Sequence, residues 1–253
     1  MLIELHGNNL YIEYYNDFKN RPTIVFLHDS LGCVALWRDF PKKIATICQC
    51  NVLIYDRLGY GKSDAMPTYV RPVNYLEVEA DVLNTILENL KIENAILFGH
   101  SDGGSIALLA ASKYPNQIKM VICEAAHIFV EEITLNGIRE AVIAYQTTNL
   151  PERLQKYHGN KTETIFKAWT ETWLRNDFRN WNIEHLLSEI QIPVLFIQGE
   201  NDEYGTLSQV EKTINGVSGV SEKLIISNAR HTPHKEMPEM IVVKIATFIA
   251  ANN

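Results

Sequence analysis

Short, continuous apolar runs alternate with segments of helical periodicity along most of the chain. The apolar runs occupy residues 23–29, 51–59, 94–100 and 118–126, and they are typical of strands buried on both faces of a sheet. Between them, apolar residues recur every three or four positions, as in the predicted helix that carries Leu76, Ala80, Leu83, Leu87 and Leu90. This alternation predicts an α/β fold with a doubly wound, mostly parallel β-sheet.

The two ends of the chain extend this pattern. Residues 2–16 predict two early strands around a Gly-Asn-Asn turn. A further helix is expected to present one apolar face, formed by Trp37, Phe40, Ile44 and Ile47. Two more strands follow within 192–200 and 222–229, and Pro238 opens the first turn of a closing helix.

One interval breaks the alternation. Between Ala126 and about Ile190 the pattern is helical and rich in aromatic residues, and it contains no strand signal. We therefore predict a core domain formed by residues 1–126 and 190–253, with a helical lid inserted at 127–189.

Composition excludes several classes of function. The net charge is −7 and no basic run occurs, which argues against nucleic-acid binding. No apolar run reaches the roughly 18 residues of a membrane span, and the charged N-terminus lacks the pattern of a signal peptide. Four sparse cysteines form neither a disulfide framework nor a metal pair, so reduced thiols and a cytoplasmic location are expected.

The stretch LFGHSDGGSIAL at 97–108 places Ser101 between a predicted strand and a predicted helix. In this context Gly-x-Ser-x-Gly forms a nucleophile elbow, because small residues at Gly99 and Gly103 allow the strand to reverse sharply into the helix. A glycine-rich turn with a capping serine is the alternative. The N–H of Asp102 would lie near the helix N-terminus, where it can face a developing oxyanion.

A serine hydroxyl needs a base, and the base needs an acid to orient it. Asp202 and His231 each follow a predicted strand, and they come after Ser101 in the order serine, acid, histidine. Strand carboxyl ends meet at one edge of an open parallel sheet, so the three residues are expected to meet there.

These segments resemble the α/β-hydrolase superfamily over nearly the whole chain. FLHDSLG resembles the oxyanion-loop segment, YDRLGYGKSD the segment after the next strand, GHSDGG the elbow, IQGENDEYG the acid segment and ARHTPHKEMPE the histidine segment. The resemblance implies that Ser101 is the nucleophile, His231 the base and Asp202 the acid. It also implies that the insertion covers the pocket and that the N–H groups of Ser30 and Asp102 form the oxyanion hole.

The chain departs from the family pattern at two places. Asp29 stands where the family usually has glycine, directly before Ser30, so its carboxylate either disturbs the oxyanion loop or hydrogen-bonds within it. Ala229-Arg230 replaces the usual small residue before the histidine.

Other polar and aromatic residues have open roles. Trp169 and Trp173 either pack in the lid or line the pocket, and His127 and Glu124 either reach the pocket or are satisfied polar residues at the domain junction. His234 is expected to point along its loop toward the final helix or solvent. His231 and His234 lack a third ligand at metal-site spacing, so neither a metal nor a cofactor is expected.

The sequence predicts a serine hydrolase that cleaves a carboxylic ester or thioester of a small, largely apolar molecule through an acyl-enzyme. Two alternatives remain open. The same triad serves C–C hydrolases that cleave vinylogous diketones, and a ligand-binding receptor with slow turnover can keep an intact triad. A dehalogenase or epoxide hydrolase of this fold is disfavoured, because it would carry aspartate at position 101.

Overall fold

A single mixed sheet organises the chain in the computed structural model, which describes residues 1–252. The strand order is β1-β2-β4-β3-β5-β6-β7-β8, with β1 and β2 antiparallel to their neighbours and the other pairs parallel. Their bounds are β1 Leu2–Leu5, β2 Asn8–Tyr15, β3 Thr23–Leu27, β4 Asn51–Tyr55, β5 Ala95–His100, β6 Ile118–Glu124, β7 Val194–Gly199 and β8 Ser221–Ile226. The predicted doubly wound, mostly parallel sheet is confirmed.

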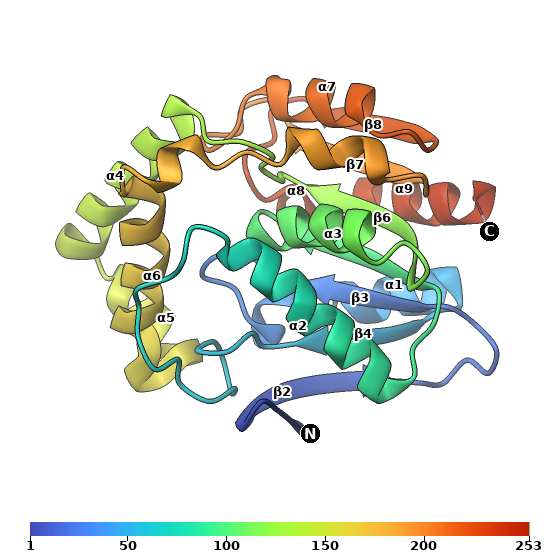
Figure 1. Cartoon of the computed structure of the whole chain (residues 1–253), viewed down its shortest axis with the longest axis horizontal. Helices are drawn as coiled ribbons and strands as arrows, with labels where there is room; N and C mark the ends of the chain where they lie inside the picture. Colours follow the sequence, from blue (N-terminus) through green and yellow to red (C-terminus); the bar gives the residue numbers. More distant parts are fainter. Residues whose placement is uncertain (253) are drawn as a thin grey trace.

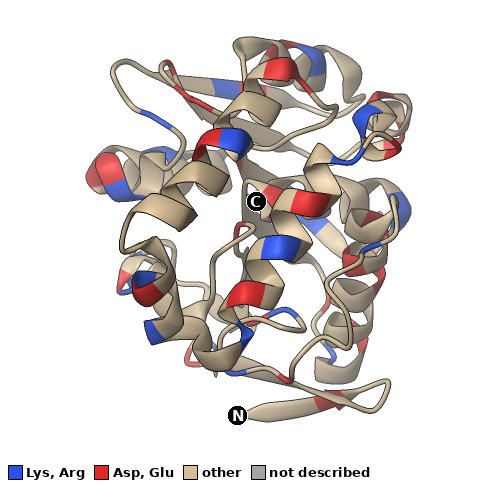
Figure 2. Cartoon of the chain, turned by 90° about the vertical axis from the view of Figure 1, so that its left-hand side faces the viewer, with Lys and Arg blue, Asp and Glu red and all other residues tan. Residues whose placement is uncertain are grey.

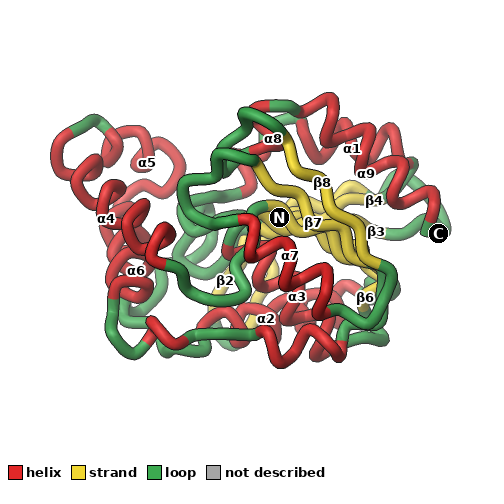
Figure 3. Tube along the Cα trace, turned by 90° about the horizontal axis from the view of Figure 1, so that it is seen from above, coloured by secondary structure: helices red, strands yellow, loops and turns green. Residues whose placement is uncertain are grey.

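Helices cover both faces of this sheet (Figures 1 and 3). The helices α2 (Tyr75–Leu90), α3 (Asp102–Lys113) and α7 (Leu207–Gly216) lie on one face. The opposite face carries α1 (Phe40–Cys48), the short α8 (Pro233–Glu236) and α9 (Pro238–Ala251). The central strands β3 and β4 are buried along their whole length, which is why their sequences are continuously apolar rather than alternating.

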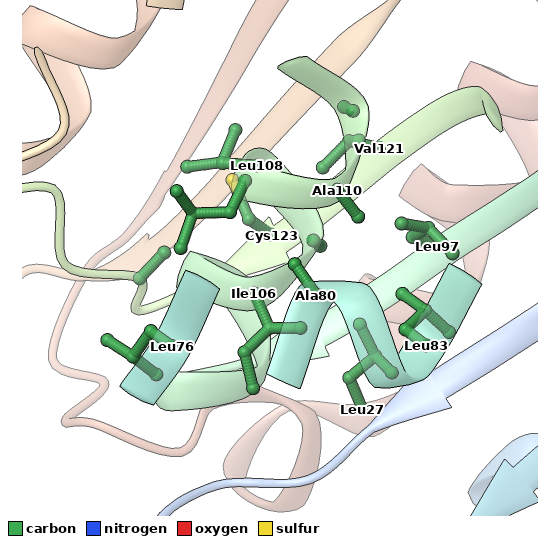
Figure 4. Packing of buried hydrophobic residues seen from close by; sticks show 14 of the residues in the cluster. Leu27, Leu76, Ala80, Leu83, Leu97, Ile106, Leu108, Ala110, Val121 and Cys123 are labelled. Atoms are coloured by element: carbon green, nitrogen blue, oxygen red, sulfur yellow. The ribbon is translucent and has the colours of Figure 1, made fainter. Parts of the chain in front are cut away.

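The helix α3 is the centre of the larger apolar core. It is buried on nearly every side because the sheet lies beneath it and α2 beside it. Figure 4 shows Leu76, Ala80 and Leu83 of α2 in the cluster that also holds Ile106 of α3 and Leu97 of β5. This packing holds the N-terminus of α3 at a fixed place at the end of β5.

Three helices and several 3-10 turns connect β6 to β7. The helices α4 (Glu132–Thr147), α5 (Leu150–His158) and α6 (Thr162–Leu174) stand together at one end of the sheet (left in Figures 1 and 3). The turns are η2 (Gly159–Lys161), η3 (Phe178–Asn180) and η4 (Glu184–Glu189). One isolated antiparallel bridge, Phe129 to Asn182, ties the start of this segment to its end. We call residues 127–189 the helical insertion.

The predicted helix around Trp37 is partly wrong. Trp37 lies in a separate 3-10 turn, η1 (Val34–Trp37), because the chain turns at Arg38 with a φ of 54° before α1 begins. Trp37, Phe40 and Ile44 are buried as expected, whereas Ile47, in the last turn of α1, is 55% exposed. The apolar face of this helix is therefore shorter than its sequence periodicity suggests.

The surface carries acidic and basic side chains in mixture. On the side formed by the helical insertion, red and blue residues alternate along the same helices (Figure 2), and Lys167 pairs with Glu163 four positions before it on α6. Among residues 1–252, no helix combines the length and apolar character needed to cross a bilayer.

Candidate active site

Ser101 occupies the sharp turn between β5 and α3. Its backbone has a φ of 55° and a ψ of −120°, a region that residues with a Cβ rarely adopt. A Cβ at Gly99 would lie 2.1 Å from the carbonyl oxygen of Gly103, and a Cβ at Gly103 would lie 2.0 Å from that of Leu27. Only glycine fits at these two positions, and this close approach of strand and helix leaves the serine hydroxyl at the tip of the turn.

The side chains of Ser101, His231 and Asp202 meet at this turn. The Nε2 of His231 lies 3.0 Å from the Oγ of Ser101, and its Nδ1 lies 2.8 Å from Oδ1 and 2.9 Å from Oδ2 of Asp202. The His231 ring therefore lies between the serine hydroxyl and the carboxylate, within hydrogen-bond distance of both.

The carboxylate of Asp202 accepts further hydrogen bonds that hold its orientation. The Nε2 of Gln198 donates to Oδ2 at 2.7 Å, and the N–H of Tyr204 donates to Oδ1 at 2.8 Å. Burial acts to raise the pKa of Asp202, but His231 and the N–H of Tyr204 outweigh it and lower that pKa. Burial likewise acts to lower the pKa of His231, but the Asp202 carboxylate outweighs it, so the pKa of His231 is raised.

The peptide bond between Asp29 and Ser30 is held through its carbonyl group. The Asp29 oxygen accepts from Nη2 of Arg57 at 2.8 Å, from Nδ1 of His28 at 2.8 Å and from the N–H of Gly32 at 3.2 Å. In a trans peptide the N–H points away from the C=O, so these three donors also define the direction of the Ser30 N–H, one of the two predicted oxyanion donors.

The same arginine approaches the second predicted donor residue. The Nη1 of Arg57 lies 3.7 Å from Oδ2 of Asp102, which also accepts from the hydroxyl of Tyr75 at 3.1 Å. Trp173 in turn donates from Nε1 to the Tyr75 hydroxyl at 2.9 Å. The backbone N–H of Asp102 is the first of α3, and such groups have no partner within their own helix.

Within residues 1–252, the hydrogen bonds that anchor the loop at Asp29 go to its backbone carbonyl and not to its carboxylate. Its Oδ1 lies over Gly32, where a Cβ would come within 1.9 Å of it. Burial acts to raise its pKa, but the neighbouring His100 and Lys235, with smaller contributions from His28 and His231, lower the pKa of Asp29 to about 2. The departure from glycine at position 29 therefore adds an ionised carboxylate beside the loop while its backbone carbonyl remains in place.

A cavity of about 200 Å³ opens above Ser101. Leu31, Ile138, Trp169 and Trp173 give it apolar walls, and Ser30, Asp102, His127 and His231 are among its polar lining. A larger cavity of about 710 Å³ lies between α4, α6 and the loop at Tyr69, but it contains none of the three triad side chains.

The three predicted substrate-binding residues all line the smaller cavity. Trp173 also packs against both Phe178 and Trp181 and is 2% exposed, so it belongs to the core of the insertion as well. The Nε2 of His127 donates to the carbonyl oxygen of Tyr204 at 3.0 Å, and within residues 1–252 its buried Nδ1 has no hydrogen-bond partner.

The expectation for His234 is wrong. The residue is 4% exposed, and both its Nδ1 and its backbone N–H donate to the Glu124 carboxylate, at 2.6 and 3.1 Å. Glu124 is fully buried at the end of β6, so a carboxylate there requires a donor, and the turn of α8 brings His234 down to it. His234 therefore points into the core rather than toward solvent.

His100, Glu124 and His234 form a buried cluster whose potential ligand atoms lie within 4.8 Å of one another. Two ligands of a tetrahedral zinc ion are separated by about 3.3 Å, given metal–ligand distances of about 2.0–2.2 Å. The 2.6 Å contact between His234 and Glu124 is shorter and has the length of a hydrogen bond. His100 donates from Nε2 to the backbone carbonyl of His231 at 2.8 Å, so the cluster supports the loop that carries the triad histidine.

Sequence patterns did not single out Arg57, Tyr75, Gln198 or His158 as parts of this site. Arg57 lies within the quoted YDRLGYGKSD segment, and its 1% exposure is the unusual feature, because a buried guanidinium needs several acceptors. Tyr75 and His158 have no local signal, since their partners lie far away in the sequence, whereas Gln198 lies only four positions before its partner Asp202.

Comparison with known proteins agrees with this architecture. Residues 22–184, well over half of the chain, match the model of the alpha/beta hydrolase fold family. The chain is 31% identical over 161 residues to the human serine hydrolase BPHL, covering 60% of this chain and 53% of that protein. It is 24% identical over 272 residues to a 2-hydroxy-6-oxononadienedioate/2-hydroxy-6-oxononatrienedioate hydrolase of Klebsiella pneumoniae, covering 96% and 92%.

Among solved structures, the enol-lactonase from Burkholderia xenovorans LB400 superposes with a TM-score of 0.78 at 17% identity, covering 99% of this chain and all of that one. At this identity the likeness concerns the fold. Together with the family match and the strand order, it shows that the chain belongs to the α/β hydrolase fold family.

Proposed function

We propose that this protein is a serine hydrolase that cleaves a carboxylic ester or thioester through an acyl-enzyme. The observation that carries the proposal is the position of His231, whose two ring nitrogens lie 3.0 Å from the Ser101 hydroxyl and 2.8 Å from the Asp202 carboxylate. Hydrogen bonding of Nδ1–H to the carboxylate leaves the Nε2 lone pair facing the serine, which is the tautomer a general base needs.

The reaction follows from these positions. Ser101 Oγ attacks the carbonyl carbon while its proton passes to His231 Nε2, and the N–H groups of Ser30 and Asp102 bind the oxyanion. His231 then gives that proton to the leaving alcohol or thiol as its bond to the carbonyl breaks. In the second half, His231 takes a proton from water, the hydroxide attacks the acyl-enzyme, and the acid leaves as Ser101 recovers its proton.

The cavity supports a small and largely apolar substrate. Its volume of about 200 Å³ and its walls of Leu31, Ile138, Trp169 and Trp173 suit a short acyl or aryl group. Because α4 and α6 supply three of these walls, we assign the helical insertion at 127–189 as a lid over a core formed by 1–126 and 190–253. The four cysteines are free, and the predicted cytoplasmic location agrees with unpaired thiols.

A C–C hydrolase is the second candidate. The relative from Klebsiella pneumoniae that covers most of this chain is named for hydrolysis of a 2-hydroxy-6-oxo dienedioate, and such a reaction would use the same three side chains. The enol-lactonase neighbour is named for a cyclic ester. A vinylogous diketone substrate separates the two candidates when it is assayed beside simple esters.

Labelling and turnover test the proposal together. A fluorophosphonate probe should label the wild-type protein at Ser101, and Ser101→Ala should remove labelling and lower the turnover of p-nitrophenyl esters by several orders of magnitude. Ser112→Ala, in α3, is a matched control that should keep both, since within residues 1–252 the Ser112 hydroxyl bonds only to the carbonyl of Leu109. Labelling that persists in Ser101→Ala would show that another residue is the nucleophile.

A further inference from the structure

His158, the last residue of α5 in the helical insertion, uses both ring nitrogens to hold two loops of the core. Its Nδ1 lies 3.0 Å from the backbone N of Gly61, and its Nε2 lies 3.0 Å from the carbonyl oxygen of Leu31. The side chain is buried, with 1% exposure, and its ring packs edge-on against Tyr60. One insertion residue thus contacts loops 97 and 127 positions earlier in the chain.

These two partners define the state of the ring. A backbone N–H only donates and a carbonyl only accepts, so Nδ1 must carry the lone pair and Nε2 the proton. The imidazole is therefore neutral, and burial, which lowers the pKa of His158, favours the same state. A side chain without both an acceptor and a donor would leave at least one buried backbone group unpaired.

Leu31 directly follows Ser30, the residue whose N–H is assigned to the oxyanion hole. Three donors hold the Asp29 carbonyl before Ser30, and His158 holds the Leu31 carbonyl after it. The Asp29–Ser30 peptide unit is thereby held before Ser30, and the Leu31–Gly32 peptide unit is held one residue after it. His158 is the contact in this arrangement that comes from the insertion.

A second route joins the insertion to the same loop. Lys161, in the turn after α5, donates from Nζ to the carbonyl oxygens of Tyr60, Gly61 and Ser63. The turn that these residues form is closed by Asp56, whose carboxylate accepts from Lys62 N–H at 2.7 Å and from Val34 N–H at 2.6 Å. Val34 lies just beyond the oxyanion loop. The route through Asp56 therefore ends next to this loop, and the route through His158 ends on it at Leu31.

We propose that His158 is a positioning residue that couples the seating of the helical insertion to the orientation of the oxyanion donor at Ser30. The inference rests on the proposed function, because it assigns that loop a role in the transition state. When the insertion is seated, the Leu31 carbonyl is held and the Ser30 N–H faces the cavity. When the insertion moves and His158 is withdrawn, the loop loses the contact at the Leu31 carbonyl and keeps the contacts at the Asp29 carbonyl.

Two variants of His158 separate hydrogen bonding from packing. His158→Leu fills a similar space without polar atoms, whereas His158→Gln keeps one acceptor and one donor on a neutral group. His185→Leu is the matched control, since His185 is an exposed histidine of the same insertion. Circular dichroism and thermal unfolding first establish that each variant is folded.

Three readouts then test the role. For His158→Leu we expect kcat on a p-nitrophenyl ester to fall by about 10- to 100-fold with KM changed by less than about threefold, because loss of an entire oxyanion donor costs about 100- to 1,000-fold. Binding of a trifluoromethyl ketone, which forms an oxyanion at the serine, should weaken by a similar factor. Amide hydrogen exchange of the peptide covering residues 28–36 should become faster. His158→Gln should restore most of each property.

The outcomes distinguish this inference from the proposed function. If the wild-type protein neither hydrolyses esters nor binds the ketone, the proposed function fails, while hydrogen exchange in residues 28–36 still reports whether His158 holds the loop. A folded His158→Leu protein with wild-type kcat, ketone affinity and exchange would overturn the inference. If His158→Leu does not fold, His158→Gln decides: a folded Gln variant with high KM but unchanged kcat would assign His158 to substrate binding and overturn it as well.

Discussion

Replacing Asp202 by asparagine tests the proposed triad most sharply. The carboxylate only accepts hydrogen bonds, and the groups around it are all oriented as donors. The ring N–H of His231, the amide of Gln198 and the N–H of Tyr204 all point at its two oxygens. Asparagine keeps the shape but has only one oxygen, so its NH2 group must face at least one of these donors. The backbone N–H of Tyr204 cannot reverse, so the new amide oxygen stays at the Oδ1 position and the NH2 group takes the Oδ2 position, 2.7 Å from Nε2 of Gln198. Nδ1 of His231 lies 2.8 Å from the first position and 2.9 Å from the second, so it meets the NH2 group as well as the oxygen.

His231 can accept a hydrogen bond from that NH2 group only by moving its proton from Nδ1 to Nε2. In this tautomer the nitrogen nearest Ser101 has no lone pair and cannot act as a base. In a Ser-His-Asp enzyme this change lowers kcat by about 10,000-fold, which corresponds to about 5.4 kcal/mol of transition-state stabilisation at 1.36 kcal/mol per factor of ten. We expect a loss of this order here, with the protein still folded.

The pH profile of kcat/KM provides a second readout. His231 must be neutral to act, so activity rises with pH through its pKa, and Asp202 raises that pKa above the usual value near 6.5. The residual activity of Asp202→Asn should therefore rise at lower pH than that of the wild type. Glu203→Gln is the control and should change kcat by less than about threefold, because Glu203 pairs with Arg230 and makes no hydrogen bond to His231. Near-normal kcat in a folded Asp202→Asn protein would refute the assignment of Asp202 as the acid.

Three further predictions concern residues around the triad. Trp173→Ala should reduce the free energy of unfolding by about 3–5 kcal/mol in urea denaturation, since it removes a buried ring and the donor to Tyr75; unchanged stability with altered chain-length preference would make Trp173 a pocket residue alone. His234→Ala should cost about 3–5 kcal/mol of stability by removing the imidazole that pairs with the buried Glu124 carboxylate, yet keep kcat within about tenfold at a temperature where it is folded, and a dead but stable variant would contradict this. Asp29→Gly should change kcat by less than about fivefold in the ester assay, because the backbone carbonyl rather than the carboxylate anchors the loop, so a collapse in rate would assign the carboxylate a role of its own.

Glu124 is expected to contribute to the loss of folding stability of the wild type as the pH falls. His234 and His100 lower its pKa below the usual 4.5 against the opposing effect of burial. A carboxyl group with a depressed pKa in the folded state stabilises the protein above its unfolded-state pKa and loses that contribution as pH falls through the folded-state value. In His234→Ala this part of the acid-induced loss of stability should be smaller, which unfolding curves at a series of pH values below 5 would measure.

Local patterns in the sequence determine the elements that carry the site. A strand buried on both faces must be continuously apolar, and the turn at Ser101 admits only small neighbours, so β5, the elbow and α3 were predictable from residues 94–108. Asp202 and His231 were predictable in the same way, because parallel strands bring their carboxyl ends to one edge of the sheet. These inferences need only the order of the elements and the direction of the strands.

The tertiary structure alone decided which buried polar groups are paired with one another. His234 looked like a loop residue because its partner, Glu124, lies 110 positions away. Ile47 was expected on the buried face of α1 but is exposed, because helix periodicity does not say how far the sheet extends beneath a helix. Arg57 and His158 reach the loop at Asp29 and Leu31 across 28 and 127 positions. A periodic pattern records whether a position is buried, whereas the identity of its partner depends on how distant segments pack, and it is those partners that orient the groups around Ser101.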